Sequence, residues 1–541
     1  MTKMQGGDYK SSLHYLALQP GHSGLFFEQF LLYFSNKDIG KLDIATSETI
    51  LRDAFHKRLS SYYNKNEISC LGELRMIMKD DFSLEKCQAP SLSIGKISHI
   101  YSPFFLNFLV IDFYIIIDNE ETKDLFSRLL AQSPNLTEIC LFRINNGGLM
   151  QIAGAHCAPS LHSIKAKVGR NSLEAITSIC QACPNLIYLD LECDFAASFG
   201  NELIPTIVQC CPLIEVLPTG LYYLTDTAMN ALSTIHTLTA FNLASNQCTS
   251  AAIQSVLRAN PRLTILTIDT PAMDDALVNC IGNYCRNLTD LTVTIDEALP
   301  PSDTAVCDLF RGCPQLARFK LNQISQFSDD CLRAMFQHCH NLVELDVFFD
   351  YAPDPTQLED IQPVVVAPYP TLTKLRVVGG GVADTALRSI LTHCINLDLI
   401  ELQGRDQMVT DETIKVLAQN CTKLDTLHLI GCHSLTVAAM LDIATYCINL
   451  RVLVCYHALI TDEVLIRLSL HCTGLTTLRF LHCRGGGSVT ETGILAVLDA
   501  CTGLTFLTLR GDMMDNLTPI LEQIKQGQLY KHIKFDMGGF P

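Results

Sequence analysis

The sequence predicts an α/β solenoid, with a curved parallel sheet on its concave side and helices on its convex side. A phrase of the form C-x-x-L-x-x-L-x-L recurs along most of the 541 residues. Its leading apolar residues lie 24 to 30 residues apart, which fits one strand, one helix and two turns. Charged residues make up 18% and hydrophobic residues 48%, which indicates a packed chain. In such an array each repeat packs on its neighbours.

The phrase is that of a leucine-rich repeat, and fifteen strands are expected. Successive side chains of a strand point to opposite faces, so the repeat's leucines face the core and the intervening positions face the concave surface. An irregular first strand is expected around Leu106, Leu109 and Ile111. The leading residues of the fifteen strands are Leu136, Leu161, Leu186, Ile214, Leu238, Leu263, Leu288, Leu316, Leu342, Leu372, Leu397, Leu424, Leu450, Leu475 and Leu504.

Helices are expected between these strands. Ten leading residues follow a cysteine by three positions, and that cysteine ends an apolar helix face spaced i, i+3, i+7, as in Ile414, Leu417 and Cys421. A residue as small as cysteine lets the helix turn closely into the strand. Pairs such as Thr410-Asp411 and Thr461-Asp462 place a capping hydroxyl before an acidic first turn, which predicts helix starts.

The remaining segments give the domain organisation. We expect a flexible leader over 1–24, a helical module over 25–62, a linker or irregular cap over 63–105, the solenoid over 106–511 and a C-terminal cap over 512–541. In the helical module Phe27, Phe30, Leu31 and Phe34 form one apolar face. A proline-rich stretch over 351–370 predicts a long loop in place of one helix.

Composition limits the partners and the compartment. The formal net charge of −17 opposes binding to nucleic acid. Most of the 24 cysteines fall in one repeat phase, which fits reduced thiols. The N-terminus has no signal-peptide h-region, and the most apolar run is too short to span a bilayer. We therefore predict a cytoplasmic and/or nuclear protein with no nucleic-acid or membrane partner.

The cysteine-containing repeats over about 130–510 resemble the repeat region of F-box/LRR proteins, which are substrate receptors of SCF ubiquitin ligases. Residues 25–62 resemble a degenerate F-box, although no Pro follows Leu25 and the chain has no Trp. The resemblance implies a Skp-type adaptor and a cullin as partners. The alternative is that this segment only caps the first repeat. The matching, adaptor-binding positions would be Phe30, Leu31, Phe34, Asp38, Ile39 and Leu42.

A protein target is expected on the concave face. Arginine and aromatic residues together are typical of protein-binding hot spots. Alternatively, opposite charges such as Glu344 and Lys374 neutralise each other across adjacent strands. The candidate partner-binding residues are Phe348, Lys374, Arg376, His428, Tyr456, Arg479, Phe506 and Arg510.

No catalytic, metal or cofactor site is predicted. The loops with Cys432-His433, Cys455/His457 and His482-Cys483 carry zinc-ligand types, but Cys432 and Cys483 occupy the slot that bonds neighbouring loops. The triple-glycine segments 379–381 and 485–487 lack the Lys-Ser/Thr of a phosphate-binding loop. Two non-enzymatic functions therefore stay open: the substrate-recognition subunit of an SCF-type ligase, and a leucine-rich-repeat scaffold or regulator with no ubiquitin role.

Overall fold

A computed structural model of the chain divides into two compact units, Met1–Cys193 and Asp194–Pro541. The domain boundaries drawn from the sequence stay predictions. The leader, the F-box-like segment and the C-terminal cap apart from residues 533–536 lie outside the described residues. The structure describes residues 73–78, 108–113, 136–142, 160–167, 173–192, 199–218, 223–245, 247–295, 300–322, 328–348, 363–379, 382–404, 409–483, 489–510 and 533–536.

The first unit contains a five-stranded parallel sheet whose strands follow one another in sequence order. Its strands are β1 (Glu73–Met78), β2 (Phe108–Phe113), β3 (Glu138–Phe142), β4 (Ser163–Lys167) and β5 (Tyr188–Glu192), and its helix is α8 (Leu173–Ala182). Strand β1 pairs with β2 although it falls in the range expected to be a linker or irregular cap. Leu71, Leu74 and Met76 follow the repeat's L-x-x-L-x-L spacing, which is the signal for this strand.

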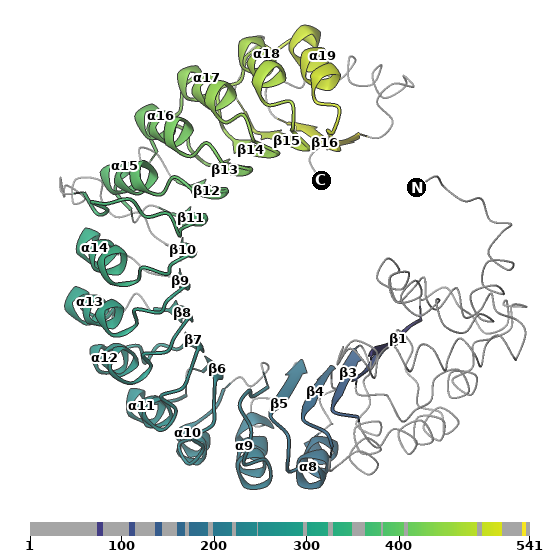
Figure 1. The fold of residues 1–541 in the computed structure, drawn as a ribbon, viewed down its shortest axis with the longest axis vertical. Helices are drawn as coiled ribbons and strands as arrows, with labels where there is room; N and C mark the ends of the chain where they lie inside the picture. The colour runs from purple at the N-terminus through teal and green to yellow at the C-terminus, as the bar shows by residue number, and fades with distance from the viewer. Residues whose placement is uncertain are drawn as a thin grey trace, which may run out of the picture. The chain divides into compact units, whose positions relative to one another are not determined.

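The second unit contains a twelve-stranded parallel sheet, again in sequence order. In Figure 1 its strands line the inner side of an arc and its helices the outer side, so the predicted fold class is confirmed. The strands are β6 (Ala240–Ala244), β7 (Ile265–Asp269), β8 (Asp290–Thr294), β9 (Arg318–Asn322), β10 (Glu344–Phe348), β11 (Lys374–Val378), β12 (Leu399–Gln403), β13 (Thr426–Ile430), β14 (Val452–Tyr456), β15 (Thr477–Leu481), β16 (Phe506–Leu509) and β17 (Lys534–Asp536).

The helices of the second unit are α9 (Phe199–Cys210), α10 (Asp226–Leu232), α11 (Ser250–Ala259), α12 (Asp275–Tyr284), α13 (Asp303–Gly312), α14 (Asp329–His338), α15 (Asp384–His393), α16 (Asp411–Asn420), α17 (Val437–Tyr446), α18 (Asp462–His471) and α19 (Glu491–Ala500). Helices α9 and α10 both precede β6, and an isolated β-bridge between Val216 and Ala240 stands where the strand led by Ile214 was predicted. From β6 to β16 one helix lies between successive strands, except that the described residues between β10 and β11 include none.

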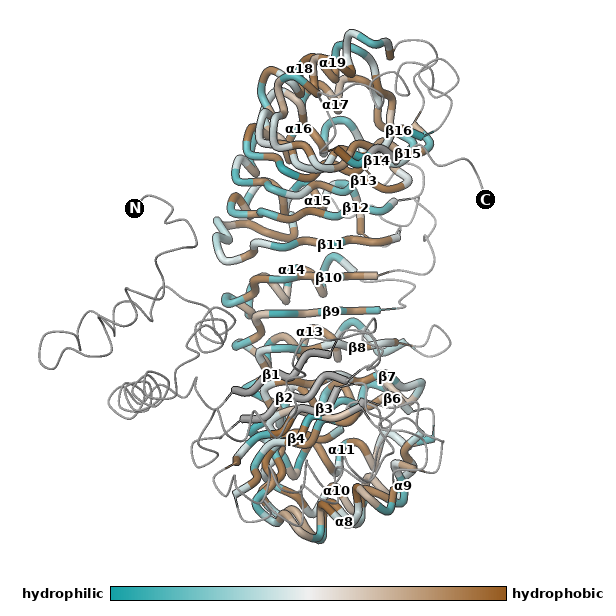
Figure 2. Tube along the Cα trace, turned by 90° about the vertical axis from the view of Figure 1, so that its right-hand side faces the viewer, coloured by the Kyte–Doolittle hydropathy of each residue, from teal (hydrophilic) through white to brown (hydrophobic). Residues whose placement is uncertain are grey.

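The core lies between the sheet and the helices. All fifteen predicted leading residues, from Leu136 to Leu504, are completely buried. Within the strands burial alternates as the repeat requires, for example in β13, where Leu427 and Leu429 are buried and Thr426, His428 and Ile430 are half-buried. Figure 2 shows β9 as a largely hydrophilic strand and β10 and β11 as largely hydrophobic ones. The L-x-L period therefore sets which side chains the concave face presents.

The repeat cysteines join neighbouring repeats as well as ending helices. Eight of them are helix C-caps, including Cys339, Cys421 and Cys472. The Cys472 thiol donates to the Cys447 carbonyl of the preceding repeat over 3.3 Å. Burial raises the pKa of Cys421 to about 12, so this thiol stays protonated and able to donate. The nineteen cysteines whose side chains the structure describes are free thiols.

The helix starts contain a second inter-repeat bond that the sequence patterns did not predict. Thr461 caps its own helix by accepting from the Val464 amide, as expected. Asp462, the next residue, accepts from the amide of Thr490 in the following repeat over 2.8 Å and also from its hydroxyl. We call this contact the Asp–Thr latch. The same contact joins Asp226 to Thr249, Asp275 to Ser302, Asp384 to Thr410 and Asp411 to Thr436, with Asn201 and Thr225 as a variant.

The proline-rich loop forms no helix in its described part, 363–370, as predicted. Tyr369 is buried there and packs edge-on against Phe336, with ring centroids 5.1 Å apart. The Ser389 hydroxyl of α15 donates to the Val365 carbonyl over 2.9 Å and accepts from the Val365 amide over 3.0 Å. The loop therefore covers α15 with backbone bonds where a helix would otherwise pack.

Candidate partner-binding surface

Strand register aligns the concave side chains of the second unit into rows. We call the middle one the central row, and its residues are direct register partners on successive strands. The predicted Lys374 and Phe506 lie in the neighbouring row, two residues earlier along each strand than the central row. Phe348 and Tyr456 lie in the row two residues later along each strand. Arg510 directly follows the end of β16. The central row from β9 to β16 consists of Lys320, Asp346, Arg376, Glu401, His428, Val454, Arg479 and Thr508.

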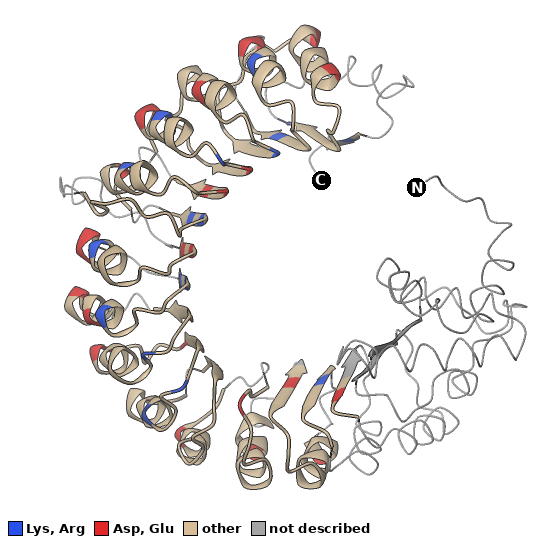
Figure 3. Ribbon diagram, in the orientation of Figure 1, with Lys and Arg blue, Asp and Glu red and all other residues tan. Residues whose placement is uncertain are grey.

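The strands from β8 to β12 carry an ion-pair ladder, in which opposite charges alternate from strand to strand (Figure 3). Arg376 is at the centre of the ladder. Its Nη1 lies 3.4 Å from Oε1 of Glu344, and its Nε lies 3.3 Å from Oε2 of Glu401. The Nη1 of Arg376 also lies 3.8 Å from Oδ2 of Asp346. The same Asp346 oxygen lies 3.3 Å from Nζ of Lys320. The ladder consists of Asp290, Arg318, Lys320, Glu344, Asp346, Lys374, Arg376 and Glu401, four acidic and four basic residues whose formal charges cancel.

The ladder bears on two of the predicted partner-binding residues. The Lys374 ammonium lies 3.9 Å from the Glu344 carboxylate, which is the cross-strand neutralisation that the sequence left open as an alternative. Arg376 is paired with three carboxylates. Both cations therefore already have partners within the sheet, while a direct role for them in binding stays a prediction.

His428 on β13 marks the end of the ladder. Its Nδ1 lies 3.9 Å from Glu401. Burial lowers the pKa of His428 below its usual 6.5, and the positive charges of Arg376 and Arg479 lower it further, against the opposing effect of Glu401. The imidazole is therefore neutral at pH 7 and adds no cation to the ladder.

The strands from β13 to β16 present a different surface, which we call the terminal surface. Their sequences, TLHLI, VLVCY, TLRFL and FLTL, contain no Asp or Glu. Phe506 is 41% exposed, and the Lys534 ammonium lies 5.3 Å from the centre of its ring. Apolar side chains share the concave positions with threonines and His428, and Arg479 and Arg510 are the arginines among them. The terminal surface consists of Ile430, Val452, Val454, Tyr456, Arg479, Leu481, Phe506 and Thr508.

The cysteine–histidine loops stack on consecutive repeats, and their thiols donate to backbone carbonyls. The ring centroids of His433 and His457 are 4.3 Å apart, and those of His457 and His482 are 5.7 Å apart. Cys432 donates to the Leu402 carbonyl and Cys483 to the Cys455 carbonyl, as the loop-bonding slot predicted. Within the described ranges no group of three or more His, Cys, Asp or Glu side chains is arranged to hold a metal ion.

The turn after a strand requires a left-handed backbone in several repeats. Gly379 and Gly431 occupy this position with φ values of 90° and 70°. His457 and His482 hold the same position with φ values of 64° and 50°. Glycine adopts these angles without strain, whereas histidine does so at a conformational cost.

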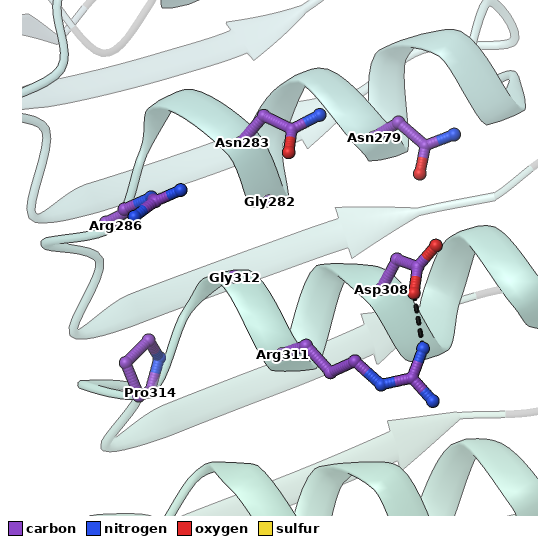
Figure 4. A pocket seen from close by; sticks show the side chains of 8 residues that line it. All are labelled: Asn279, Gly282, Asn283, Arg286, Asp308, Arg311, Gly312 and Pro314. Atoms are coloured by element: carbon purple, nitrogen blue, oxygen red, sulfur yellow. Dashed lines mark hydrogen bonds and ion pairs between the residues drawn. The ribbon is translucent and has the colours of Figure 1, made fainter.

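A depression of about 410 Å³ lies on the convex side between α12 and α13 (Figure 4). A Cβ atom at Gly312 would overlap the Gly282 carbonyl, so the two helices approach closely because both residues are glycine. Arg311 is ion-paired with Asp308 at its edge. The lining is polar and consists of Asn279, Gly282, Asn283, Arg286, Asp308, Arg311, Gly312 and Pro314. It brings together none of the residues predicted for binding.

The chain was compared with family models and with solved structures. No family model matches the chain. The chain is similar to a structure of the yeast Rad7 and Elc1 complex, with 15% identity over 90% of this chain and 91% of that chain and a TM-score of 0.37. It is also similar to a TLR13–ssRNA13 complex, with 14% identity over 74% of this chain and a TM-score of 0.37. The match spans 59% of the TLR13 chain.

Neither likeness identifies an activity. In the part of the chain that the structure describes, no helix is long and apolar enough to cross a membrane. The adaptor-binding residues predicted between Phe30 and Leu42 lie outside that part. The chain's own geometry establishes a leucine-rich-repeat solenoid, and its concave face places the predicted His428, Tyr456, Arg479 and Phe506 on four successive strands.

Proposed function

We propose that this chain is the substrate-recognition subunit of an SCF-type ubiquitin ligase of the cytoplasm and/or nucleus. Residues 25–62 would dock the Skp-type adaptor and bring the chain to the cullin, and the terminal surface would bind the target protein. The chain would do no covalent chemistry itself. Its contribution would be proximity, because holding a target beside a ubiquitin-conjugating enzyme makes an intermolecular step effectively intramolecular.

The observation that carries the binding half is the terminal surface. Tyr456, Arg479 and Phe506 share the concave side of neighbouring strands that contain no carboxylate. Buried or half-buried aromatic and arginine side chains carry most of the energy at protein interfaces. The neighbouring ion-pair ladder is internally neutral, which leaves the terminal surface as the concave region best suited to a partner.

The adaptor half rests on the sequence alone. Phe30, Leu31 and Phe34 match the first helix of an F-box, and Asp38, Ile39 and Leu42 match its second. The short helical module also precedes the repeats, which is the order found in F-box/LRR proteins. If these residues dock an adaptor, a charge at the centre of their apolar face must disrupt the contact.

The test is recovery of the adaptor and cullin with the tagged full-length protein. We expect both to copurify with the wild type and with the conservative variant Leu42→Met, but not with Phe34→Asp or Leu42→Asp. The far-ultraviolet circular dichroism and the thermal midpoint of the solenoid should be the same in all four proteins. If the wild type recovers neither adaptor nor cullin, the leucine-rich-repeat scaffold with no ubiquitin role replaces this proposal.

A further inference from the structure

Arg479 differs from the other basic side chains on the concave sheet. Arg318, Lys320, Lys374 and Arg376 are each ion-paired with a carboxylate of the ladder. Arg479 makes no ion pair in the described part of the chain, and its own strand and both neighbouring strands contain no Asp or Glu. Within the described residues Arg479 is therefore a cation without a neutralising carboxylate.

Two polar groups at this position are also buried without partners. The Arg479 Nε is closed to solvent and makes no hydrogen bond. Thr508, the register partner of Arg479 on β16, is completely buried, and its hydroxyl likewise has no partner. Buried polar groups in folded proteins are nearly always hydrogen-bonded, and an unpaired one is satisfied by a water, an ion or a partner group.

The surroundings of Arg479 favour a strong interaction with an anion. Val454, its register partner on β14, is 8% exposed, and Leu481 two residues along its strand is 4% exposed. His428 is within electrostatic reach and neutral at pH 7. An ion pair formed among apolar side chains is less screened than one in open solvent, so the guanidinium attracts an anion more strongly here than on an exposed surface.

We propose that Arg479 anchors a carboxylate or phosphate on an otherwise apolar segment of the bound partner protein. This inference rests on the proposed partner-binding function and adds the chemistry of the bound segment. Charge complementarity selects the anion, and Tyr456 and Phe506 on the flanking strands provide the apolar contact on either side. A carboxylate and a phosphate both fit a guanidinium, and the test below separates them.

The experiment selects displayed random peptides on the full-length wild type, on Arg479→Leu and on Arg311→Leu. Arg311 is a matched control because it lies on convex α13, ion-paired with Asp308. We expect the wild type and Arg311→Leu to enrich peptides with an acidic residue among apolar ones, and Arg479→Leu to lose this enrichment. Selected peptides are then synthesised with the acidic residue, with its amide and with phosphoserine at that position.

Fluorescence anisotropy measures the dissociation constant of each form. For the wild type we expect the amide form to bind about 10- to 100-fold more weakly than the acidic form, as for loss of a hydrogen bond to a charged group. Arg479→Leu should bind the acidic and amide forms equally. Tighter binding of the phosphoserine form would assign the site to phosphate, and weaker binding would assign it to carboxylate.

Absence of acidic enrichment on the wild type, or a preserved acidic preference in Arg479→Leu, overturns the inference. If peptides bind the wild type without acidic preference and are lost in Tyr456→Ala, this inference fails but the proposed binding surface stands. If no peptide binding depends on Tyr456, Phe506 or Arg479, both fail. Arg479→Gln repeats each measurement with a polar side chain, so that a folding defect in Arg479→Leu does not decide the result.

Discussion

The ion-pair ladder and the terminal surface are built on the same repeat but present opposite chemistry. Both have completely buried leading leucines, and both have Asp–Thr latches, at Asp384 in the first region and Asp462 in the second. They differ in the outward positions of their strands, which are charged and mutually paired in the ladder and contain no carboxylate in the terminal surface. The contacts that hold the repeats together are therefore the same in both regions, while the chemistry of the concave side chains differs.

The largest expected effect separates binding from stability at the terminal surface. Tyr456→Ala and Phe506→Ala should each weaken binding of a peptide selected on the wild type about 30-fold, as expected for an aromatic hot spot worth about 2 kcal/mol. Fluorescence anisotropy measures this. Val366→Ala is the control, because Val366 is 69% exposed but lies off the concave strands. If Val366→Ala weakened peptide binding equally, the effect would not be specific to the aromatic residues of the terminal surface.

The next effect is on stability and belongs to the ladder. Arg376→Leu should lower the free energy of unfolding by about 2 kcal/mol, because Glu344, Asp346 and Glu401 are left without their shared cation. The side chain is 34% exposed, so solvent screening keeps the loss below that of a fully buried pair. Urea unfolding measures the change, and Arg376→Lys should fall between the wild type and Arg376→Leu. An unchanged midpoint for Arg376→Leu would show that the ladder is not stabilising.

The latches should behave alike in the two regions. Asp384→Ala and Asp462→Ala should each cost about 1–2 kcal/mol, since each removes a charged acceptor of the next repeat's amide and hydroxyl. Urea unfolding again reports the change, with the exposed Glu412→Ala, which pairs only with Lys415 on its own helix, as the control. If one substitution lowered the free energy of unfolding strongly and the other did not, the contacts between repeats would differ between the two regions, as the concave faces do.

The smallest effect is a pH dependence at the border between the two regions. The pKa of His428 in the folded chain lies below its usual 6.5, so the unfolded chain takes up this proton first as the pH falls. The stabilisation is complete above about pH 6.5 and is lost below it. His428→Gln should therefore unfold with a flatter pH dependence between pH 7 and 5, measured by urea titration at each pH. A steeper dependence would contradict the direction of this shift.

The sequence predicted the frame of the solenoid well because that frame depends on local patterns. The spacing of the leading leucines, the cysteine C-caps and the caps at Thr410 and Thr461 all follow from neighbours within one repeat. It also placed Phe348, Tyr456 and Phe506 on the concave face, since strand periodicity alone decides the side. Strand β1 was missed because its single L-x-x-L-x-M pattern lies in a weakly patterned stretch.

Contacts between repeats could not be predicted in the same way. Asp462 looked like a first-turn charge on its own helix, and only the stacking of repeats shows that it bonds Thr490, 28 residues later. Arg376 and Arg479 likewise occupy the same position of the repeat, and the sequence named both as partner-binding. Register separates them, since it sets Arg376 beside Asp346 and Glu401 but Arg479 beside Val454 and Thr508.

That separation is tested most directly by comparing Arg479→Leu with Arg376→Leu in urea unfolding of the full-length protein. The two substitutions are chemically identical and lie in the same row of the same sheet. We predict that Arg479→Leu leaves the free energy of unfolding within about 0.5 kcal/mol of the wild type, as for a residue without a partner in the fold, while Arg376→Leu loses about 2 kcal/mol. Equal losses in the two variants would contradict the account, because Arg479 would then stabilise the solenoid as Arg376 does.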